Sequence, residues 1–168
     1  MAYVTKATTK GGRNGRAMLD NGGLALAMGL PKEMGGAGEG HNPEQLFALG
    51  WSACFGQAVL ALAKKHGLDG QAGEVGCNVT IDKDEVSFAL KAELSLRIPG
   101  ADKEKVQALL EDAHKICPYS RATRNNVPTL PGSWTPSRAR VSPSVSALGA
   151  SGTRRIFPTA RTADGVGK

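Results

Sequence analysis

The sequence predicts an α+β fold, because two helical patterns flank a pair of alternating strands within the first 127 residues. The first pattern is a long apolar helix over residues 42–63, and the second is an amphipathic helix over residues 102–116. Between them, residues 75–98 alternate apolar and polar side chains in two runs joined by a charged turn, which is typical of a β-hairpin.

The helix over residues 42–63 has clear start and stop signals. Asn42 is a favourable N-cap, and Pro43 suits the first helical position because its missing N–H would have no partner there. A run of cations followed by Gly67 marks the end of the helix. Because the run between these signals contains almost no charge, we expect the helix to be buried nearly all round.

The chain has three cysteines, Cys54, Cys77 and Cys117. They show no C-x-x-C spacing and no histidines at zinc-site spacing, so we expect no metal site. Cys54 lies in the middle of the apolar helix, Cys77 on the inner face of a strand, and Cys117 continues the apolar stripe of the second helix. Buried free cysteines are usually inert, so the pattern alone leaves open whether Cys54 reacts or only packs.

The residues before the apolar helix predict a strand and two loops. β-branched residues indicate an opening strand over residues 3–9. The loop over residues 10–16 sets Arg13 and Arg16 among glycines, and either a solvated turn or an anion-binding arginine fits that pattern. The glycine-rich segment over residues 31–41 lacks a phosphate-binding motif, which favours a surface loop.

The formal net charge of +6 belongs mainly to the C-terminal part of the chain. Basic and acidic residues nearly balance over residues 1–127, so the body has no electrostatic footprint for nucleic acid. The chain opens with no apolar segment of the signal-peptide kind, and no apolar run reaches membrane-spanning length. We therefore expect a cytoplasmic protein with no membrane partner.

Residues 128–168 differ in composition from the rest of the chain. They are rich in Ser, Pro and Arg and hold five of the nine prolines, so they offer little apolar surface to bury and we expect disorder. We interpret this basic tail as an out-of-frame C-terminus. The alternative is a tail that binds nucleic acid or anionic surfaces. The predicted domain therefore spans residues 1–127.

Several motifs resemble those of the organic hydroperoxide resistance (Ohr) proteins of the Ohr/OsmC superfamily. Residues 42–55, N-P-E-Q-L-F-A-L-G-W-S-A-C-F, resemble the peroxidatic-cysteine helix of that family. Residues 117–125, C-P-Y-S-R-A-T-R-N, resemble its resolving-cysteine motif, and residues 11–16, G-G-R-N-G-R, resemble its arginine loop. The resemblance covers about residues 3–127. After it, the family's final apolar strand is missing from the pattern.

The resemblance implies antiparallel sheets wrapped around two central helices in an intertwined homodimer. It also implies a thiol peroxidase that reduces alkyl or fatty-acid hydroperoxides to alcohols, with a lipoyl-type dithiol reductant and no bound cofactor. By position, Cys54 would be the peroxidatic cysteine, passing through a sulfenate to a disulfide with Cys117, the resolving cysteine. Arg13 would activate the thiolate, with Arg16 as its rival, and Glu44 would hold the arginine.

Two physical considerations bear on these roles. Cys54 lies too far along its helix for the dipole to favour a thiolate, so another positive charge must do so. Glu44 lies about 15 Å from Cys54 along a straight helix, so either Arg13 bridges part of the gap or a second subunit completes the site. The competing readings are a catalytically silent binding protein on the same scaffold and an OsmC-type peroxidase.

Overall fold

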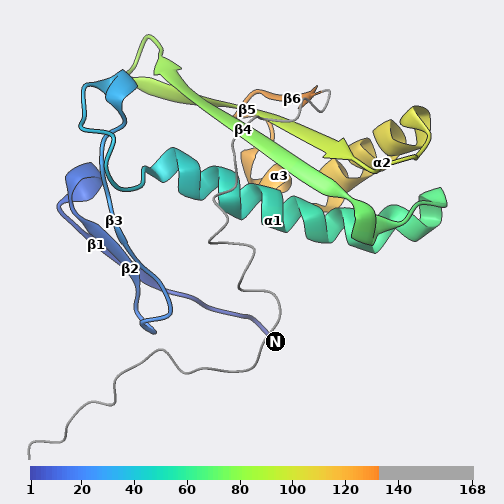
Figure 1. The fold of residues 1–168 in the computed structure, drawn as a ribbon, viewed down its shortest axis with the longest axis horizontal. Coiled ribbons are helices and arrows are strands. Elements are labelled where there is room, and N and C mark those ends of the chain that lie inside the picture. The colour runs from blue at the N-terminus through green and yellow to red at the C-terminus, as the bar shows by residue number, and fades with distance from the viewer. Residues whose placement is uncertain (133–168) are drawn as a thin grey trace, which may run out of the picture. The chain divides into compact units, whose positions relative to one another are not determined.

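The computed structural model describes residues 1–132, which form two three-stranded sheets and several helices (Figure 1). The strands are β1 (Ala7–Lys10), β2 (Arg16–Leu19), β3 (Ala25–Ala27), β4 (Glu74–Lys83), β5 (Phe88–Arg97) and β6 (Thr129–Gly132). The α-helices are α1 (Pro43–Ala63), α2 (Lys103–Ile116) and α3 (Pro118–Thr123). Short 3-10 turns are η1 (Gly12–Asn14), η2 (Lys32–Met34), η3 (Lys64–His66) and η4 (Gly70–Ala72). The predicted α+β class is confirmed.

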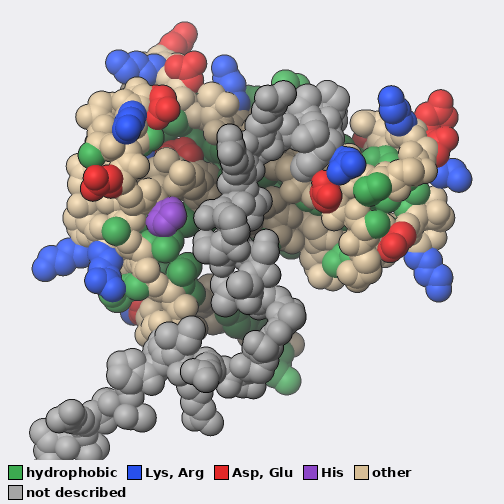
Figure 2. Space-filling model, in the orientation of Figure 1, with side chains coloured by type: hydrophobic (Ala, Val, Ile, Leu, Met, Phe, Trp, Pro, Cys, Tyr) green, Lys and Arg blue, Asp and Glu red, His purple; other side chains and the backbone are tan. Residues whose placement is uncertain are grey.

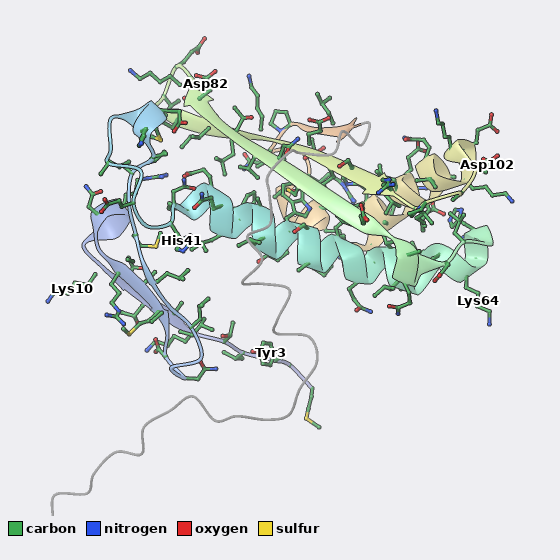
Figure 3. The ribbon with its side chains drawn as sticks, in the orientation of Figure 1. Tyr3, Lys10, His41, Lys64, Asp82 and Asp102 are labelled. Carbon is green, nitrogen blue, oxygen red and sulfur yellow. The ribbon has the colours of Figure 1, made fainter. Side chains whose placement is uncertain are left out.

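Helix α1 begins and ends at the predicted signals. The side chain of Asn42 accepts a hydrogen bond from the Gln45 N–H at 2.8 Å, and the Gln45 side chain accepts one from the Asn42 N–H at 3.0 Å. At the other end, Gly67 takes a left-handed conformation with φ 68° after η3. In Figure 3, α1 accordingly runs from beside the labelled His41 to the labelled Lys64.

Helix α1 is buried on one side, so the expectation of burial all round is wrong for the described chain. Trp51 and Phe55 are fully buried, in a cluster that includes residues of β5 and α2. By contrast, Leu49 is 66% exposed and Leu60 is 40% exposed. The helix is apolar on more sides than the described residues cover, because the hairpin and helices α2 and α3 enclose only part of its surface.

The segment Pro43–His66 is long and apolar enough to cross a membrane, judged by length and composition alone. The expectation that no apolar run reaches that length is therefore wrong. The core helix of a soluble protein passes the same test. Trp51 and Phe55 pack into the core of the described fold, which is the environment of such a core helix.

Strands β4 and β5 form the predicted antiparallel hairpin, which lies across α1 (Figure 1). Their register runs from Glu74 opposite Arg97 to Lys83 opposite Phe88. The second strand begins later than the alternation predicts, because the Asp84 side chain accepts hydrogen bonds from two backbone N–H groups in the turn. The core beneath the hairpin is formed by Leu94, Leu96, Leu109, Leu110 and Ala113, together with the buried side of α1.

The β1-β2-β3 sheet has almost no core of its own. Its first strand begins at Ala7, four residues later than predicted, and all four residues of β1 are exposed. Extensive packing between this sheet and the helices is absent from the described residues. An isolated three-stranded sheet of such short strands needs a hydrophobic surface to cover one face before it is stable.

Strand β6 departs from the expectation that no strand follows Asn126. Residues Thr129–Gly132 pair in parallel with Ala92–Ser95 at the edge of β5. The strand is short, and its first two residues are not arranged as in a strand that faces a core. The apolar Leu130 is 68% exposed, whereas the polar Thr129 is half-buried. The described fold thus extends five residues beyond the predicted boundary at residue 127, and residues 133–168 of the predicted tail lie outside the described residues.

Charged side chains of both signs are interspersed over the described surface that faces the viewer in Figure 2. Neither sign forms a continuous patch on that face. This agrees with the balance of basic and acidic residues in the sequence of the body.

Candidate active site

The structure brings two of the three cysteines together. Cys54 lies in the middle of α1, and Cys117 lies at the junction of α2 and α3. Their sulfur atoms are 3.6 Å apart, and both are free thiols. Cys117 is fully buried, whereas Cys54 is partly accessible. The two cysteines are therefore close enough to react with each other, and only one of them is open to another molecule.

The pair is held in place by packing between α1 and α2. The ring of Phe55, next to Cys54, meets the ring of His114 edge-on with centroids 4.8 Å apart. His114 lies one helical turn before Cys117. These contacts bring the two helices together at the level of the cysteines, so the separation of the sulfur atoms is set by the core.

Burial raises the pKa of the Cys54 thiol, and the neighbouring Cys117 adds to this rise. A hydrogen bond from the backbone of Tyr119 acts in the opposite direction. Arg13 is not among the groups of the described chain that shift this pKa. Among residues 1–132, the thiol form of Cys54 is therefore favoured, and no positive charge stabilises its thiolate.

An aromatic cluster lies along α1 just before Cys54. Phe47 meets Trp51 edge-on with ring centroids 5.3 Å apart, and it packs against Tyr119 at a tilt with centroids 6.1 Å apart. The Trp51 Nε1–H donates to Ser120 Oγ at 3.2 Å, which fixes the start of α3 against α1. Gly50 leaves room for Tyr119, because a Cβ at residue 50 would lie 2.9 Å from the Tyr119 hydroxyl oxygen.

Arg13 and Glu44 form a bidentate ion pair. The guanidinium nitrogens donate to the two carboxylate oxygens at 2.6 and 2.8 Å. The hydrogen bonds from Arg13 hold the pKa of Glu44 below its ordinary value, and those to Glu44 raise the pKa of Arg13. Arg16 lies on β2, is exposed, and has no ion pair among the described residues. Of the two candidate arginines, Arg13 is the one that meets Glu44.

The four candidate residues thus form two separate pairs. Glu44 lies in the first turn of α1, whereas Cys54 lies ten residues further along the same helix. One chain brings Arg13 to Glu44 and Cys54 to Cys117, but it does not bring the ion pair to the thiols.

The sequence did not predict the contacts of three residues near the cysteines, Trp51, Tyr119 and Ser120. Tyr119 and Ser120 belong to the C-P-Y-S run, where a proline directly after a cysteine indicates a change of chain direction. The sequence therefore contained a signal for the turn that holds Tyr119 and Ser120. It contained none for the contact of Trp51, because its partner Ser120 lies 69 residues away along the chain.

Cys77 lies on β4 and lines a cavity of about 330 Å³ together with Glu44. Burial raises the pKa of its thiol to about 11, so it stays protonated at neutral pH. The structure places this cysteine against the core, as the alternation predicted. Within residues 1–132, no three side chains of metal-binding type come together.

Comparisons with known proteins agree on one family. Residues 36–130 match the family model described as OsmC-like protein. The organic hydroperoxide resistance protein of Xanthomonas axonopodis pv. citri is 42% identical over 128 residues, covering 74% of this chain and 89% of that protein. The organic hydroperoxide resistance protein OhrB of Bacillus subtilis is 39% identical over 127 residues, covering 74% of this chain and 93% of that protein.

A solved structure is similar in fold as well. The crystal structure of an organic hydroperoxide resistance protein from Legionella pneumophila superposes with a TM-score of 0.73 at 35% identity. It covers 80% of this chain and 99% of that chain.

Proposed function

The chain belongs to the OsmC-like protein family, in its organic hydroperoxide resistance branch, and we propose that it is a thiol peroxidase that reduces organic hydroperoxides to alcohols. The observation that carries this proposal is the 3.6 Å separation of the Cys54 and Cys117 sulfur atoms beside a partly open helix surface. A disulfide needs the sulfurs about 2.05 Å apart, so a small shift of either side chain suffices.

The reaction runs in two steps. The Cys54 thiolate attacks one peroxide oxygen, the O–O bond breaks, and the departing alkoxide takes a proton to become the alcohol. Cys54 is left as a sulfenic acid. The Cys117 thiol then loses its proton and attacks the Cys54 sulfur, which forms the disulfide and releases water. A dithiol of lipoyl type, with its own oxidation to a disulfide, restores both thiols.

We propose that a second subunit supplies the charge that stabilises the Cys54 thiolate. Burial raises the pKa of Cys54, and no cation within residues 1–132 offsets that rise. The Arg13–Glu44 pair lies elsewhere on the same chain, preorganised by its two hydrogen bonds. The uncovered β1-β2-β3 sheet and the exposed Leu49 of α1 are surfaces that a homodimer would bury. Such a dimer would bring Arg13 of one subunit to Cys54 of the other.

The rest of the proposal concerns substrate and setting. The aromatic and aliphatic side chains around Cys54, including Phe47 and Trp51, favour alkyl or fatty-acid hydroperoxides over hydrogen peroxide. Two unpaired thiols beside each other remain reduced in the cytoplasm, which is where we place the protein. We propose no bound cofactor, no membrane partner and no nucleic acid partner.

The direct test measures consumption of cumene hydroperoxide with dihydrolipoamide as reductant. We expect turnover by the parent chain and none by Cys54→Ser. Cys117→Ser should perform one reaction with the hydroperoxide and then accumulate over-oxidised Cys54, which mass spectrometry detects as added oxygen. Cys77→Ser is the matched control and should turn over like the parent. Folded parent protein without turnover would leave a silent binding protein on this scaffold as the better reading.

A second test asks whether the site is shared between subunits. Glu44→Ala and Cys54→Ser chains are each expected to be inactive or nearly so. If each site takes Cys54 from one subunit and Glu44 from the other, a mixed dimer regains one intact site. Mixed dimers, purified with two different affinity tags, should then show about half the parent activity per dimer. Mixed dimers no more active than the Glu44→Ala and Cys54→Ser homodimers would show that each chain builds its site alone.

A further inference from the structure

A second cavity lies between α2 and the segment that leads from α3 into β6. Its volume is about 550 Å³, within the usual range for small-molecule sites. The lining comes from the last two turns of α2, from Ser120, and from residues 124–129. None of Cys54, Cys117, Arg13 and Glu44 lines it, so the cavity is distinct from the candidate active site.

The cavity has apolar walls. Leu110 of α2 is buried, and Val127 and Pro128 approach from the chain entering β6. Thr129 of β6 is half-buried and also lines the cavity. An apolar chain of a ligand would gain dispersion contacts with Leu110, Val127 and Pro128 there.

The guanidinium of Arg124, an exposed residue, also lines the cavity. Arg124 donates from one nitrogen to the backbone oxygen of His114 at 2.8 Å, which anchors it at the end of α2. Within residues 1–132 it forms no ion pair with a carboxylate. An arginine held by one hydrogen bond keeps its other N–H groups available, and these suit a carboxylate.

Two further polar groups face the same cavity. Ser120 is 5% exposed and accepts from Trp51 Nε1, while its own hydroxyl proton has no acceptor among the described residues. Burial and the nearby Arg124 lower the pKa of His114, so its imidazole is neutral at pH 7 and can donate or accept. Both groups can bind a ligand oxygen without adding charge.

Glu111 is the one acidic residue that lines the cavity. Its side chain is exposed and accepts a hydrogen bond from Gln107 Nε2 at 2.9 Å on the outer surface of α2. No ion pair joins it to Arg124 in the described chain. Glu111 therefore lies at the rim, where it weakens the attraction of an anion but does not neutralise the arginine.

We propose that this cavity binds an alkyl carboxylate, such as a medium-chain fatty acid, with its carboxylate on Arg124 and its chain against Leu110, Val127 and Pro128. Ser120 connects the cavity to Trp51, and Trp51 packs beside the residues that surround Cys54. An occupied cavity is therefore reported by the environment of Trp51. This site does not depend on the proposed peroxidase activity, since no residue of that mechanism lines it.

The test uses octanoate as the probe and the full chain with Trp134→Phe, which leaves Trp51 as the only tryptophan of the two in the sequence. Binding is measured by calorimetry and by the change in Trp51 fluorescence. We expect saturable binding of one octanoate per chain. Octanol, which has the chain without the charge, should bind at least about tenfold more weakly, because a hydrogen bond to a charged group contributes about 1.5–3 kcal/mol.

Three variants test the position of the carboxylate. Arg124→Gln should weaken octanoate binding by about tenfold to a hundredfold. Because Arg124 also anchors α2, Asn126→Asp provides a second route. It adds a repelling charge at the lining and breaks no side-chain hydrogen bond among residues 1–132. Glu111→Gln should strengthen binding by removing a like charge. Arg121→Gln is the matched control, because Arg121 is an exposed arginine of α3 that does not line the cavity.

The proposal is overturned if octanoate shows no saturable binding to the folded chain. It is equally overturned if octanol binds as tightly as octanoate, or if Arg124→Gln and Asn126→Asp leave the affinity of octanoate unchanged. If Arg121→Gln weakened octanoate binding as much as Arg124→Gln, the effect would come from the overall surface charge. That result would also overturn the proposal.

Discussion

The contact between Trp51 and Ser120 provides a stability test that does not depend on any enzymatic role. Trp51 is fully buried, and its Nε1–H donates to Ser120 Oγ at 3.2 Å. Ser120→Ala removes the acceptor and leaves a buried donor without a partner, which costs about 1–3 kcal/mol. Because Ser120 also lines the second cavity, water can approach the indole, so we expect the lower part of that range, about 1–2 kcal/mol.

The assay is equilibrium unfolding in urea at one fixed protein concentration, which keeps any contribution from association constant. With a slope of about 2 kcal/mol per molar urea, the midpoint should fall by about 0.5–1 M. The control is the same substitution in a Trp51→Phe background, where no indole donor is left and the cost should drop to a few tenths of a kcal/mol. An equal cost in both backgrounds would refute the hydrogen-bond explanation.

Three other predictions concern the start of α2, the Arg13–Glu44 pair and Cys77. Asp102→Ala removes the side chain that accepts hydrogen bonds from the Glu104 and Lys105 N–H groups at the start of α2. The free energy of unfolding should therefore fall by about 0.5–2 kcal/mol, and an unchanged urea midpoint would contradict this. The pKa of Glu44 is lowered by Arg13, so their pairing stabilises the fold at neutral pH and is lost as pH falls below the ordinary value of 4.5 and through the lowered one. The stability difference between the parent and Glu44→Gln should therefore shrink in acid unfolding curves below about pH 4.5, and a difference that grows there would be evidence against the pair. Cys77, with its pKa at about 11, should react with iodoacetamide at pH 8 about 100-fold more slowly than an ordinary exposed cysteine when the other two cysteines are serines; labelling at the ordinary rate would show that it is not buried against the core.

The helices illustrate how far local sequence signals reach. Asn42 and Asp102 are N-caps in the structure as they are in the pattern, because capping depends on residues within one turn of each other. The hairpin register likewise follows from the alternation of side chains. The start of β5 was placed too early, because the hydrogen bonds of Asp84 in the turn were not visible in the alternation.

The exposure of α1 is a different kind of error. A helix that is apolar all round indicates that all of its surface is to be covered, but the pattern does not say by what. The described chain covers the side that carries Trp51 and Phe55 and leaves Leu49 exposed. Which surface covers the remainder depends on an assembly and not on the periodicity of one helix.

The candidate active site likewise has features that the sequence predicts and features that depend on how the chain packs. The helices, the hairpin and the residues that resemble an Ohr site could be predicted from the sequence, since these depend on local spacing and on motifs. The pairing of Glu44 with Arg13 rather than Arg16, and the 3.6 Å between the sulfur atoms of Cys54 and Cys117, came from the fold. Those contacts join residues 31 and 63 positions apart, and such distances are set by the packing of the helices and the path of the loops, which no local pattern encodes.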